Sequence, residues 1–405
     1  MAPHPSTSHA SSTHTTLNLS GMVMAKLKPA KIFKNAVDAP PAPATGSQSQ
    51  KTSNPPSRSI TGITFDDRGD QLLTAGEDET FKLYSCKSGK VLKTFYSKKY
   101  GVDLPRFTHK NTAIVHASTK EDDTVRYHSL HDNKYLAYFR GHTDKVISLE
   151  VSPIDDGFMS GSMDKTVRLW DLRTPVCRGL LKLPAPPVVA YDSTGMVFAV
   201  AVNHYQRILL YDQANYDKAP FLTIELNDPT LLTISYPPRP IYVTSMSFSN
   251  DSKFLLVGCS GDTHYVVDSF DGIILARLEG HTALERVSMT SPPLIQPAKG
   301  ISGEEVSWTP DSKYVISGSL DGRIFIWDIQ SLNGVLGDER RKPFKMLRLK
   351  ANAVLDGHPG PSRCVKFNPR FAMMCTAGTE LAFWLPDPAV DAEEVAKDLL
   401  KKRAS

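Results

Sequence analysis

Apolar and polar residues alternate along short segments of this chain, and turn-forming residues separate the segments. The clearest example runs from Phe158 to Asp171. It reads FMSGS, then the turn MDK, then TVRLWD, in which Val167 and Leu169 share one face. Because alternation with period two is typical of β-strands, this segment predicts a strand, a tight turn and a second strand. The preceding KVISLEVSP predicts one more strand, which Pro153 ends.

The same strand–turn–strand pattern occurs seven times. Copies lie at residues 70–86, 111–130, 158–171, 196–213, 253–270, 312–329 and 371–387. They recur every roughly 40 to 60 residues, which is typical of a β-propeller, where four-stranded blades stack in a ring because no blade can bury both faces alone. No segment between the copies predicts a long helix. The sequence therefore predicts an all-β fold, a seven-bladed propeller over residues 21–388.

The segments outside the repeats predict how the ring closes. We expect a strand near residues 30–34 (AKIFK) to pair with the last blade, since this removes an exposed sheet edge. The Pro- and Ser-rich stretch 38–58 predicts a loop outside the ring. Residues 1–20 carry no apolar pattern and predict a disordered tail. Residues 389–405 place apolar side chains on one helical face, which predicts a short amphipathic helix, either solvated or docked on a partner.

Composition excludes several classes of protein. Hydrophobic residues make up 40% of the 405 residues, and the net charge of +4 is too small to indicate nucleic acid as the main ligand. The apolar run MVFAVAV (196–202) is far shorter than the ~20 residues of a transmembrane helix, so no membrane association is expected. The five cysteines form no CxxC pair, which argues against a disulfide framework or zinc site and favours a reducing compartment.

Three residue types of a hydrolase triad, His142, Ser160 and Asp164, lie in one repeat, but their context indicates a structural role. Ser and Asp recur at the same positions of another copy, as Ser317 and Asp321, whereas one active site is enough for an enzyme. The sequence shows no metal-ligand cluster, Gly-rich phosphate loop or paired carboxylates in a plausible cleft. We therefore expect no catalytic, cofactor-binding or metal site.

These motifs resemble those of the WD40-repeat family, through a GH dipeptide at 141–142 and a WD dipeptide at 170–171. The resemblance implies a buried tetrad within one blade, formed by His142, Ser160, Asp164 and Trp170. In it the carboxylate accepts a hydrogen bond from the imidazole, which contacts the hydroxyl, and the hydroxyl accepts the indole N–H. Such groups are tolerated in a core only when each satisfies another.

A second tetrad is implied in the copy at 312–329. Its members are His281, Ser317, Asp321 and Trp327, with the histidine supplied across an insertion. Other copies depart from the pattern. Gly261 and Gly378 stand where the turn Asp would be, so we expect their blades to lack the full network and to rely on apolar packing.

Strings between the strands are similar to one subgroup of this family. YSKKYGVDL (96–104), SLHDNKY (129–135) and the closing AFWLP (382–386) look like the WD-repeat subunit of COMPASS-type histone H3 lysine 4 methyltransferase complexes. The resemblance implies a nuclear, non-catalytic adaptor without a cofactor. Implied partners are the methyltransferase catalytic subunit, the other COMPASS subunits and the phosphorylated tail of transcribing RNA polymerase II. The alternative function is a subunit of the phosphatase module of the mRNA cleavage and polyadenylation factor, whose other subunits would then be the partners. A further alternative is a WD40 substrate receptor of a ubiquitin ligase.

Two surfaces are candidates for partner binding. The loop YSKKYG follows the outer strand of the first blade, and Arg140 lies in the corresponding loop one blade further on. Propellers place such loops on one face, so we expect Tyr96, Lys98, Lys99, Tyr100 and Arg140 to form a surface suited to a phosphorylated, extended segment. The insertion 338–358 predicts either an outer strand with solvated lysines or a weaker contact for nucleic-acid phosphates. Its basic residues are Arg340, Arg341, Lys342, Lys345, Arg348 and Lys350.

Overall fold

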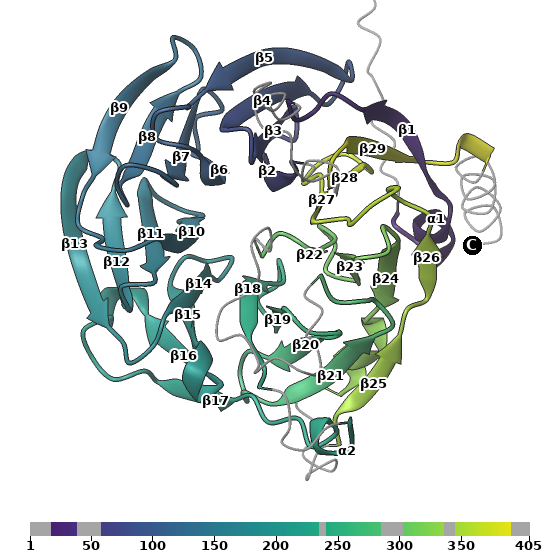
Figure 1. Ribbon diagram of the computed structural model, residues 1–405. Coiled ribbons are helices and arrows are strands. Elements are labelled where there is room, and N and C mark those ends of the chain that lie inside the picture. The colour runs from purple at the N-terminus through teal and green to yellow at the C-terminus, as the bar shows by residue number, and fades with distance from the viewer. Residues whose placement is uncertain (1–17, 39–57, 235–239, 285–302, 336–344, 390–405) are drawn as a thin grey trace, which may run out of the picture.

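A computed structural model of the chain describes residues 18–38, 58–234, 240–284, 303–335 and 345–389. Seven β-sheets stand like blades around a central axis (Figure 1). The predicted all-β, seven-bladed propeller is thereby confirmed, and only two short α-helices occur in the described part of the chain. The predicted tail up to residue 17 and the predicted helix beyond residue 389 lie outside the described residues.

Blades 1 to 4 each use four consecutive antiparallel strands, ordered from the axis outward. Blade 1 holds β2 (Ile60–Phe65), β3 (Gln71–Gly76), β4 (Thr80–Ser85) and β5 (Lys90–Tyr96). Blade 2 holds β6 (Asp103–Phe107), β7 (Ala113–Ala117), β8 (Val125–Ser129) and β9 (Lys134–Phe139). Blade 3 holds β10 (Val146–Val151), β11 (Gly157–Ser162), β12 (Thr166–Asp171) and β13 (Thr174–Lys182). Blade 4 holds β14 (Pro187–Tyr191), β15 (Val197–Val202), β16 (Arg207–Asp212) and β17 (Leu222–Glu225).

Blades 5 to 7 depart from consecutive order. Blade 5 holds β18 (Val243–Phe248), β19 (Phe254–Cys259), β20 (Thr263–Asp268) and β21 (Ile274–Glu279), with β25 (Leu347–Lys350) added in parallel as a fifth strand. Blade 6 holds β22 (Val306–Trp308), β23 (Tyr314–Gly318), β24 (Ile324–Asp328) and β26 (Ala353–Leu355). Blade 7 holds β27 (Cys364–Phe367), β28 (Met374–Ala377), β29 (Leu381–Pro386) and β1 (Leu27–Phe33). The helices are α1 (Gly21–Ala25), α2 (Leu231–Ile234) and the 3-10 turns η1 (Asn203–Tyr205), η2 (Gln213–Asn215) and η3 (Gln330–Gly334).

The ring closes where β1 pairs antiparallel with β29, from Leu27 opposite Pro386 to Phe33 opposite Leu381. The closing strand thus begins three residues before the predicted start at residue 30. The expected tail also ends earlier than residue 20, because Leu19 is only 9% exposed. The Ser20 hydroxyl accepts the backbone N–H of Val23 at 3.3 Å and caps α1.

The core of the protein lies between adjacent blades. Phe81 and Phe95 of blade 1, for example, form one buried cluster with Phe107 and Ile114 of blade 2. Inner strands carry apolar side chains on both faces, because each face of a blade is covered by a neighbouring blade. Burial on both faces explains why β3 and β7 read as short, nearly continuous apolar runs.

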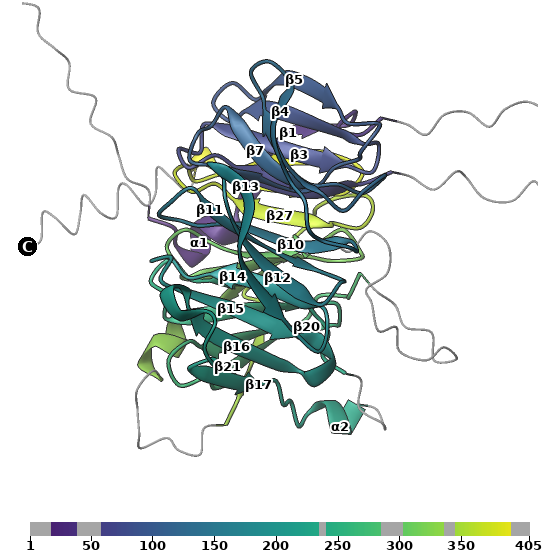
Figure 2. The same ribbon diagram turned by 90° about the vertical axis from the view of Figure 1, so that its left-hand side faces the viewer.

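Connections from the outer strand of one blade to the inner strand of the next lie on one face of the ring. Residues 97–102, 140–145 and 280–284 belong to such connections, and the face that they define is called the connecting face below. The helix α2, which lies in the connection from β17 to β18, projects from this face (Figure 2). The candidate partner-binding loops therefore share one face.

Candidate partner-binding face and buried networks

Blade 3 contains a closed network of buried polar side chains. His142, in the connection from β9 to β10, places Nδ1 2.8 Å from an Asp164 carboxylate oxygen and Nε2 2.7 Å from Ser160 Oγ. The Trp170 indole N–H donates to the same hydroxyl oxygen at 2.8 Å. All four residues of the first tetrad thus meet, and they join the connection, β11, the following turn and β12.

The buried surroundings of this tetrad favour a structural role over a catalytic one. Burial lowers the pKa of His142, and the neighbouring Asp164 only partly offsets this. Ser160 is fully buried, so its hydroxyl cannot reach a substrate. The Asp164 carboxylate also accepts the Thr166 backbone N–H at 2.9 Å and the Thr166 hydroxyl at 2.6 Å. Each polar group therefore has a partner, as a core requires.

The expected second tetrad is not formed. The Ser317 hydroxyl lies 3.0 Å from Nε2 of His264, a residue of β20 in blade 5 that the sequence pattern did not single out. His281 stacks on His264 instead, with ring centroids 4.2 Å apart and planes at 9°. Because His264 reaches across from the neighbouring blade, it takes the hydroxyl that His281 was expected to contact.

The other two members of that expected tetrad also have different partners. The Trp327 indole donates to the Glu279 backbone carbonyl at 3.1 Å. The Asp321 carboxylate accepts the Arg323 guanidinium N–H at 2.6 Å. In blade 6 the turn carboxylate is therefore paired with a surface arginine, and among the described residues it makes no hydrogen bond to a histidine.

Blade 7 holds a three-membered network that the sequence reasoning missed. His358 Nε2 lies 2.8 Å from the Thr376 hydroxyl, which also accepts the Trp384 indole N–H at 2.7 Å. Gly378 occupies the position of the turn Asp, so the histidine lacks the carboxylate that His142 has. The GH dipeptide at 357–358 and the Trp were visible in the sequence, but the threonine was not recognised as a substitute for serine.

Blade 2 uses an arginine where blade 3 uses a histidine. Arg126 is 1% exposed, and its guanidinium donates to both Asp122 carboxylate oxygens at 2.8 Å and to the Ser118 hydroxyl. Burial alone would raise the pKa of Asp122, but the Arg126 hydrogen bonds and charge hold it below its ordinary value. The guanidinium also lies 3.7 Å from the ring centroid of Tyr100. This ion pair of a buried arginine and a partly exposed aspartate is a second feature that the repeat pattern did not reveal.

The residues of the candidate partner surface pack as pairs of a cation and a tyrosine. The Lys98 ammonium lies 5.6 Å from the Tyr96 ring centroid, and the Lys99 ammonium lies 5.0 Å from that of Tyr100. The Arg140 guanidinium lies 5.5 Å from the ring of Tyr138, which was not predicted. Cations held over aromatic rings in this way gain roughly 0.5–1 kcal/mol at exposed sites.

Arg126 connects the two loops of this surface. Its guanidinium contacts Tyr100 and also lies 5.7 Å from the ring centroid of Tyr138. Tyr96 and Tyr138 remain 57% and 40% exposed. The resulting surface, called the Tyr–Lys surface below, comprises Tyr96, Lys98, Lys99, Tyr100, Tyr138 and Arg140. It combines exposed aromatic area with cations that form no ion pair among the described residues.

The basic insertion is only partly described. Arg340, Arg341 and Lys342 lie outside the described residues, and Lys345 is exposed just before β25. Arg348 is paired with Glu279 at 2.9 and 3.0 Å, and Lys350 ends β25. The segment was predicted as an outer strand of its own blade. Instead β25 joins blade 5, and only β26 completes blade 6.

Charged side chains also meet at the axis of the ring. Arg106 in β6 of blade 2 lies 3.2 Å from Glu150 of blade 3 and 2.8 Å from Glu304, which precedes β22 of blade 6. Lys366 of blade 7 lies 3.8 Å from Glu304. Because blades 2 and 6 are not neighbours, the Arg106–Glu304 pair spans the inner end of the ring. Burial raises the pKa of Glu304, but the Arg106 and Lys366 charges more than compensate.

In the part of the chain that the structure describes, no three His, Cys, Asp or Glu side chains gather in a way that could hold a metal ion. None of the described helices is long and apolar enough to cross a membrane.

Three segments, 47–85, 133–171 and 304–328, match the family model described as "WD domain, G-beta repeat". WD repeat-containing protein 82 of Drosophila melanogaster is 42% identical over 328 residues, which cover 81% of this chain and 90% of that protein. Set1 complex component swd2 of Schizosaccharomyces pombe is 34% identical over 80% of this chain and 92% of its own length. The chain belongs to the Swd2 family of WD40-repeat proteins. Another member, COMPASS component SWD2 of Saccharomyces cerevisiae, is 32% identical over 81% of this chain and 91% of that protein.

The segments that match the repeat model differ in their buried hydrogen-bond networks. The matched segment 133–171 contains the complete tetrad of blade 3. The segment 304–328 contains Ser317 and Trp327, whose partners differ from those of that tetrad. In this Swd2-family chain, similarity to the repeat model therefore does not guarantee the same hydrogen bonds.

Proposed function

We propose that this Swd2-family chain is a non-catalytic adaptor subunit of a nuclear, COMPASS-type histone H3 lysine 4 methyltransferase complex. The observation that carries the proposal is its similarity, over about four-fifths of its length, to two proteins named as components of the Set1 complex and of COMPASS. The architecture supports the same role, because a rigid ring offers several loops on one face to different partners. The fully buried Ser160 supports a structural reading of the most enzyme-like constellation.

The Tyr–Lys surface is the proposed contact for a phosphorylated, extended segment such as the tail of RNA polymerase II. Tyrosines supply rigid apolar area to a partner, and Lys and Arg bind phosphate by charge. The Arg140 guanidinium can donate two parallel hydrogen bonds to one phosphate group. The cations of this surface pack on tyrosine rings, so a phosphate would not first have to displace a carboxylate.

Affinity purification of the tagged full-length chain from its own cells tests the adaptor role. We expect recovery of the methyltransferase catalytic subunit and further COMPASS subunits by mass spectrometry. Recovery of cleavage and polyadenylation subunits alone would instead assign the chain to the phosphatase module of the mRNA cleavage and polyadenylation factor. Recovery of a cullin adaptor would identify a ubiquitin-ligase receptor, and methylation of nucleosomes by the pure chain would contradict the adaptor role itself.

A triple charge reversal tests the proposed surface. Lys98→Glu, Lys99→Glu and Arg140→Glu should abolish binding of a phosphorylated polymerase-tail peptide in fluorescence anisotropy, while circular dichroism stays unchanged. The matched control reverses Lys90, Lys110 and Lys134, which are exposed in the same two blades but near the opposite face. Retained peptide binding in the folded triple variant, or equal loss in the control, would show that this face is not the interface.

A further inference from the structure

A basic side chain occupies the same position of the third strand in three neighbouring blades. The residues are Lys82 in β4, Arg126 in β8 and Arg168 in β12. Each lies opposite a residue of the second strand of its own blade, as Arg168 lies opposite Ser160. Lys82 and Arg126 are buried, and Arg168 is half-buried. Because a charge withdrawn from water needs an acceptor, the three positions can be compared by their partners.

In blades 1 and 2 the chain itself supplies the acceptor. The Lys82 ammonium donates to the Asn35 backbone carbonyl at 2.9 Å and lies 3.4 Å from Asp38. The Arg126 guanidinium donates to both carboxylate oxygens of Asp122, each at 2.8 Å. Two parallel hydrogen bonds of this kind match the fork of a guanidinium to a carboxylate. Blade 2 therefore shows what an arginine at this position binds.

In blade 3 the corresponding carboxylate, that of Asp164, is already in use. One of its oxygens lies 2.8 Å from His142 Nδ1 and accepts the Thr143 backbone N–H at 3.2 Å. The other oxygen accepts the backbone N–H and the hydroxyl of Thr166. Arg168 forms no hydrogen bond and no ion pair among the described residues, and its Nε atom is shielded from solvent. The tetrad of blade 3 thus leaves its arginine without an anion.

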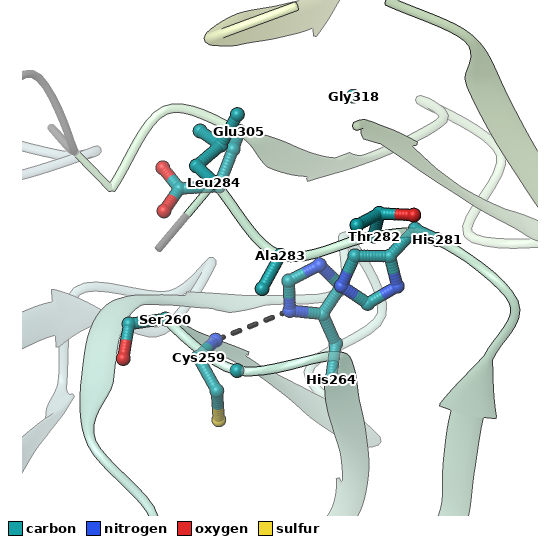
Figure 3. A pocket seen from close by; sticks show the side chains of 10 residues that line it. Cys259, Ser260, His264, His281, Thr282, Ala283, Leu284, Glu305 and Gly318 are labelled. Atoms are coloured by element: carbon teal, nitrogen blue, oxygen red, sulfur yellow. Dashed lines mark hydrogen bonds between the residues drawn. The ribbon is translucent and has the colours of Figure 1, made fainter. Parts of the chain in front are cut away.

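The other four blades carry no charge at this position. Their residues are Leu209, Tyr265, Phe325 and Ala382. In blade 6 the Phe325 ring packs against His281. His281 in turn stacks on His264 (Figure 3). Burying an aromatic ring at this position needs no anion, so the seven described blades contain one unpaired cation at this position, Arg168.

The Arg168 guanidinium lies at the connecting face, next to the Tyr–Lys surface. It packs directly against Gly141, because a Cβ atom at this glycine would lie 2.6 Å from Arg168 Nη1. Gly141 follows Arg140, an exposed member of the Tyr–Lys surface. Burial lowers the pKa of His142, and the charge of Arg168 acts in the same direction. The unpaired guanidinium is therefore continuous with the surface proposed for partner binding.

We propose that Arg168 binds the carboxylate of an aspartate or glutamate side chain in an extended segment of a protein partner. This carboxylate would accept two parallel hydrogen bonds, as Asp122 does from Arg126 in blade 2. Arginines that receive an acidic motif are a recurring mode of peptide recognition. The protein nature of the ligand rests on the proposed adaptor function, whereas the need for an anion rests on the unpaired guanidinium.

The surroundings of Arg168 favour a carboxylate over a phosphate. The charges of Arg168 and Asp123 both act on His142. Burial raises the pKa of Asp123, and the charge of Asp144 adds to the increase. A ligand at Arg168 therefore approaches negative groups as well as a positive one. A phosphate carries about 1.5 to 2 negative charges at pH 7 and would be repelled more strongly than a carboxylate with a single charge.

NMR titration of the full-length protein, with its arginines labelled with nitrogen-15, tests the site directly. The Nε–H signal of Arg168 is identified by its absence in Arg168→Lys. The probe is the peptide acetyl-Gly-Glu-Gly-amide, and the comparison is acetyl-Gly-Gln-Gly-amide, which has the same shape without the charge. We expect a saturable shift of the Arg168 signal with the glutamate peptide only. The Arg126 signal is the internal control and should not move, because Asp122 already occupies that guanidinium.

Three outcomes of the titration would overturn the proposal. An equal shift with the glutamine peptide would show that the carboxylate is not recognised. An unmoved Arg168 signal would show that no anion binds there. A third titration uses acetyl-Gly-phosphoserine-Gly-amide, and tighter binding of this peptide than of the glutamate peptide would contradict the choice of a carboxylate.

Arg168→Met tests whether the guanidinium serves binding or stability. Methionine keeps the apolar stem and removes the charge. The melting temperature should stay the same or rise, because no ion pair is lost, whereas Arg126→Met should lower it by leaving Asp122 without its cation. In the affinity purification, Arg168→Met should reduce recovery of the partner subunits by about ten-fold, as loss of an arginine anchor does.

The purification also separates this proposal from the proposed function. Absence of COMPASS subunits from the wild-type purification would contradict the adaptor role and leave the titration result standing. Full recovery of the wild-type partners with Arg168→Met would overturn the role of Arg168. A loss of stability as large as that of Arg126→Met would likewise overturn it, by assigning the guanidinium to the fold.

Discussion

The buried serine hydroxyls of blades 3 and 6 are contacted by histidines from different places in the fold. Ser160 is engaged by His142 of the preceding connection. Ser317 is engaged by His264, which lies in a strand of the neighbouring blade. The spacing of residues within one repeat predicted the first contact. The second depends on how two blades pack, which no spacing within a repeat encodes.

This difference predicts unequal effects of the same substitution in two blades. Asp164→Ala removes the acceptor of the buried His142 and should lower the free energy of unfolding by roughly 1–3 kcal/mol. Asp321→Ala removes only a partner of Arg323 at the surface, and its effect should be clearly smaller. Urea denaturation of both variants measures the contrast. Equal losses would mean that the blade 3 network does not stabilise its blade.

The charged cluster at the axis predicts that loss of Arg106 destabilises the protein. Arg106→Gln removes the nearest cation from the buried Glu304 and from the half-buried Glu150 and leaves only the more distant Lys366 beside Glu304. Breaking a buried pair costs roughly 3–5 kcal/mol. Arg348→Gln is the control, because Arg348 is largely exposed to solvent and its partner Glu279 keeps a second cation, Arg277. Thermal unfolding should show a large drop in melting temperature for the first variant only. A similar, small change in both would show that the axial cluster contributes little.

Among the elements, the two that cross between blades were the hardest to predict. The closing strand was expected from AKIFK, but its first residues were missed because Lys28 and Pro29 interrupt the apolar pattern. The helix α1 has only five residues, too few to show a helical period. The parallel pairing of β25 with β21 joins residues about 70 positions apart, and it depends on tertiary packing. In contrast, all strands with two-residue alternation inside a repeat could be predicted.

The N-terminal elements predict where the chain can be shortened. Removing residues 1–17 should leave stability unchanged, because Leu19, the Ser20 cap and β1 all remain. Removing residues 1–36 deletes β1 and should expose the edge of β29, which promotes aggregation. Size-exclusion chromatography and thermal unfolding of the two products would compare them. A monomeric longer truncation with the stability of the full chain would contradict closure by β1.

At the scale of the whole molecule, acid should destabilise the ring through its buried histidines. The pKa is lowered, chiefly by burial, in six of them: His116, His128, His142, His264, His281 and His358. The unfolded chain binds protons at these rings near pH 6.5, whereas the folded chain does not. Their contribution to stability is therefore complete above pH 6.5 and is lost as the pH falls toward 4.

Urea denaturation at pH 7, 6, 5 and 4 measures this dependence. Each histidine that is protonated only in the unfolded chain should lower the free energy of unfolding by about 1.4 kcal/mol per pH unit. His116→Leu removes one such ring from a fully buried position, so its slope should be shallower. His109, whose pKa is raised by its bond to Asp67, acts in the opposite direction above pH 6.5. A stability that does not change between pH 7 and 4 would contradict the expectation.

The pairing of β1 with β29 also has a consequence for how the protein is made. Phe33 is synthesised long before Leu381, the residue opposite it in the closing sheet. At ~5–20 residues per second, the roughly 350 residues between them take the ribosome about 20 to 70 s to add. During that time the edge of β1 is open, and its exposed lysines, Lys28 and Lys31, discourage pairing with another chain. Translation that stops before residue 381 therefore yields a nascent chain that cannot close its ring.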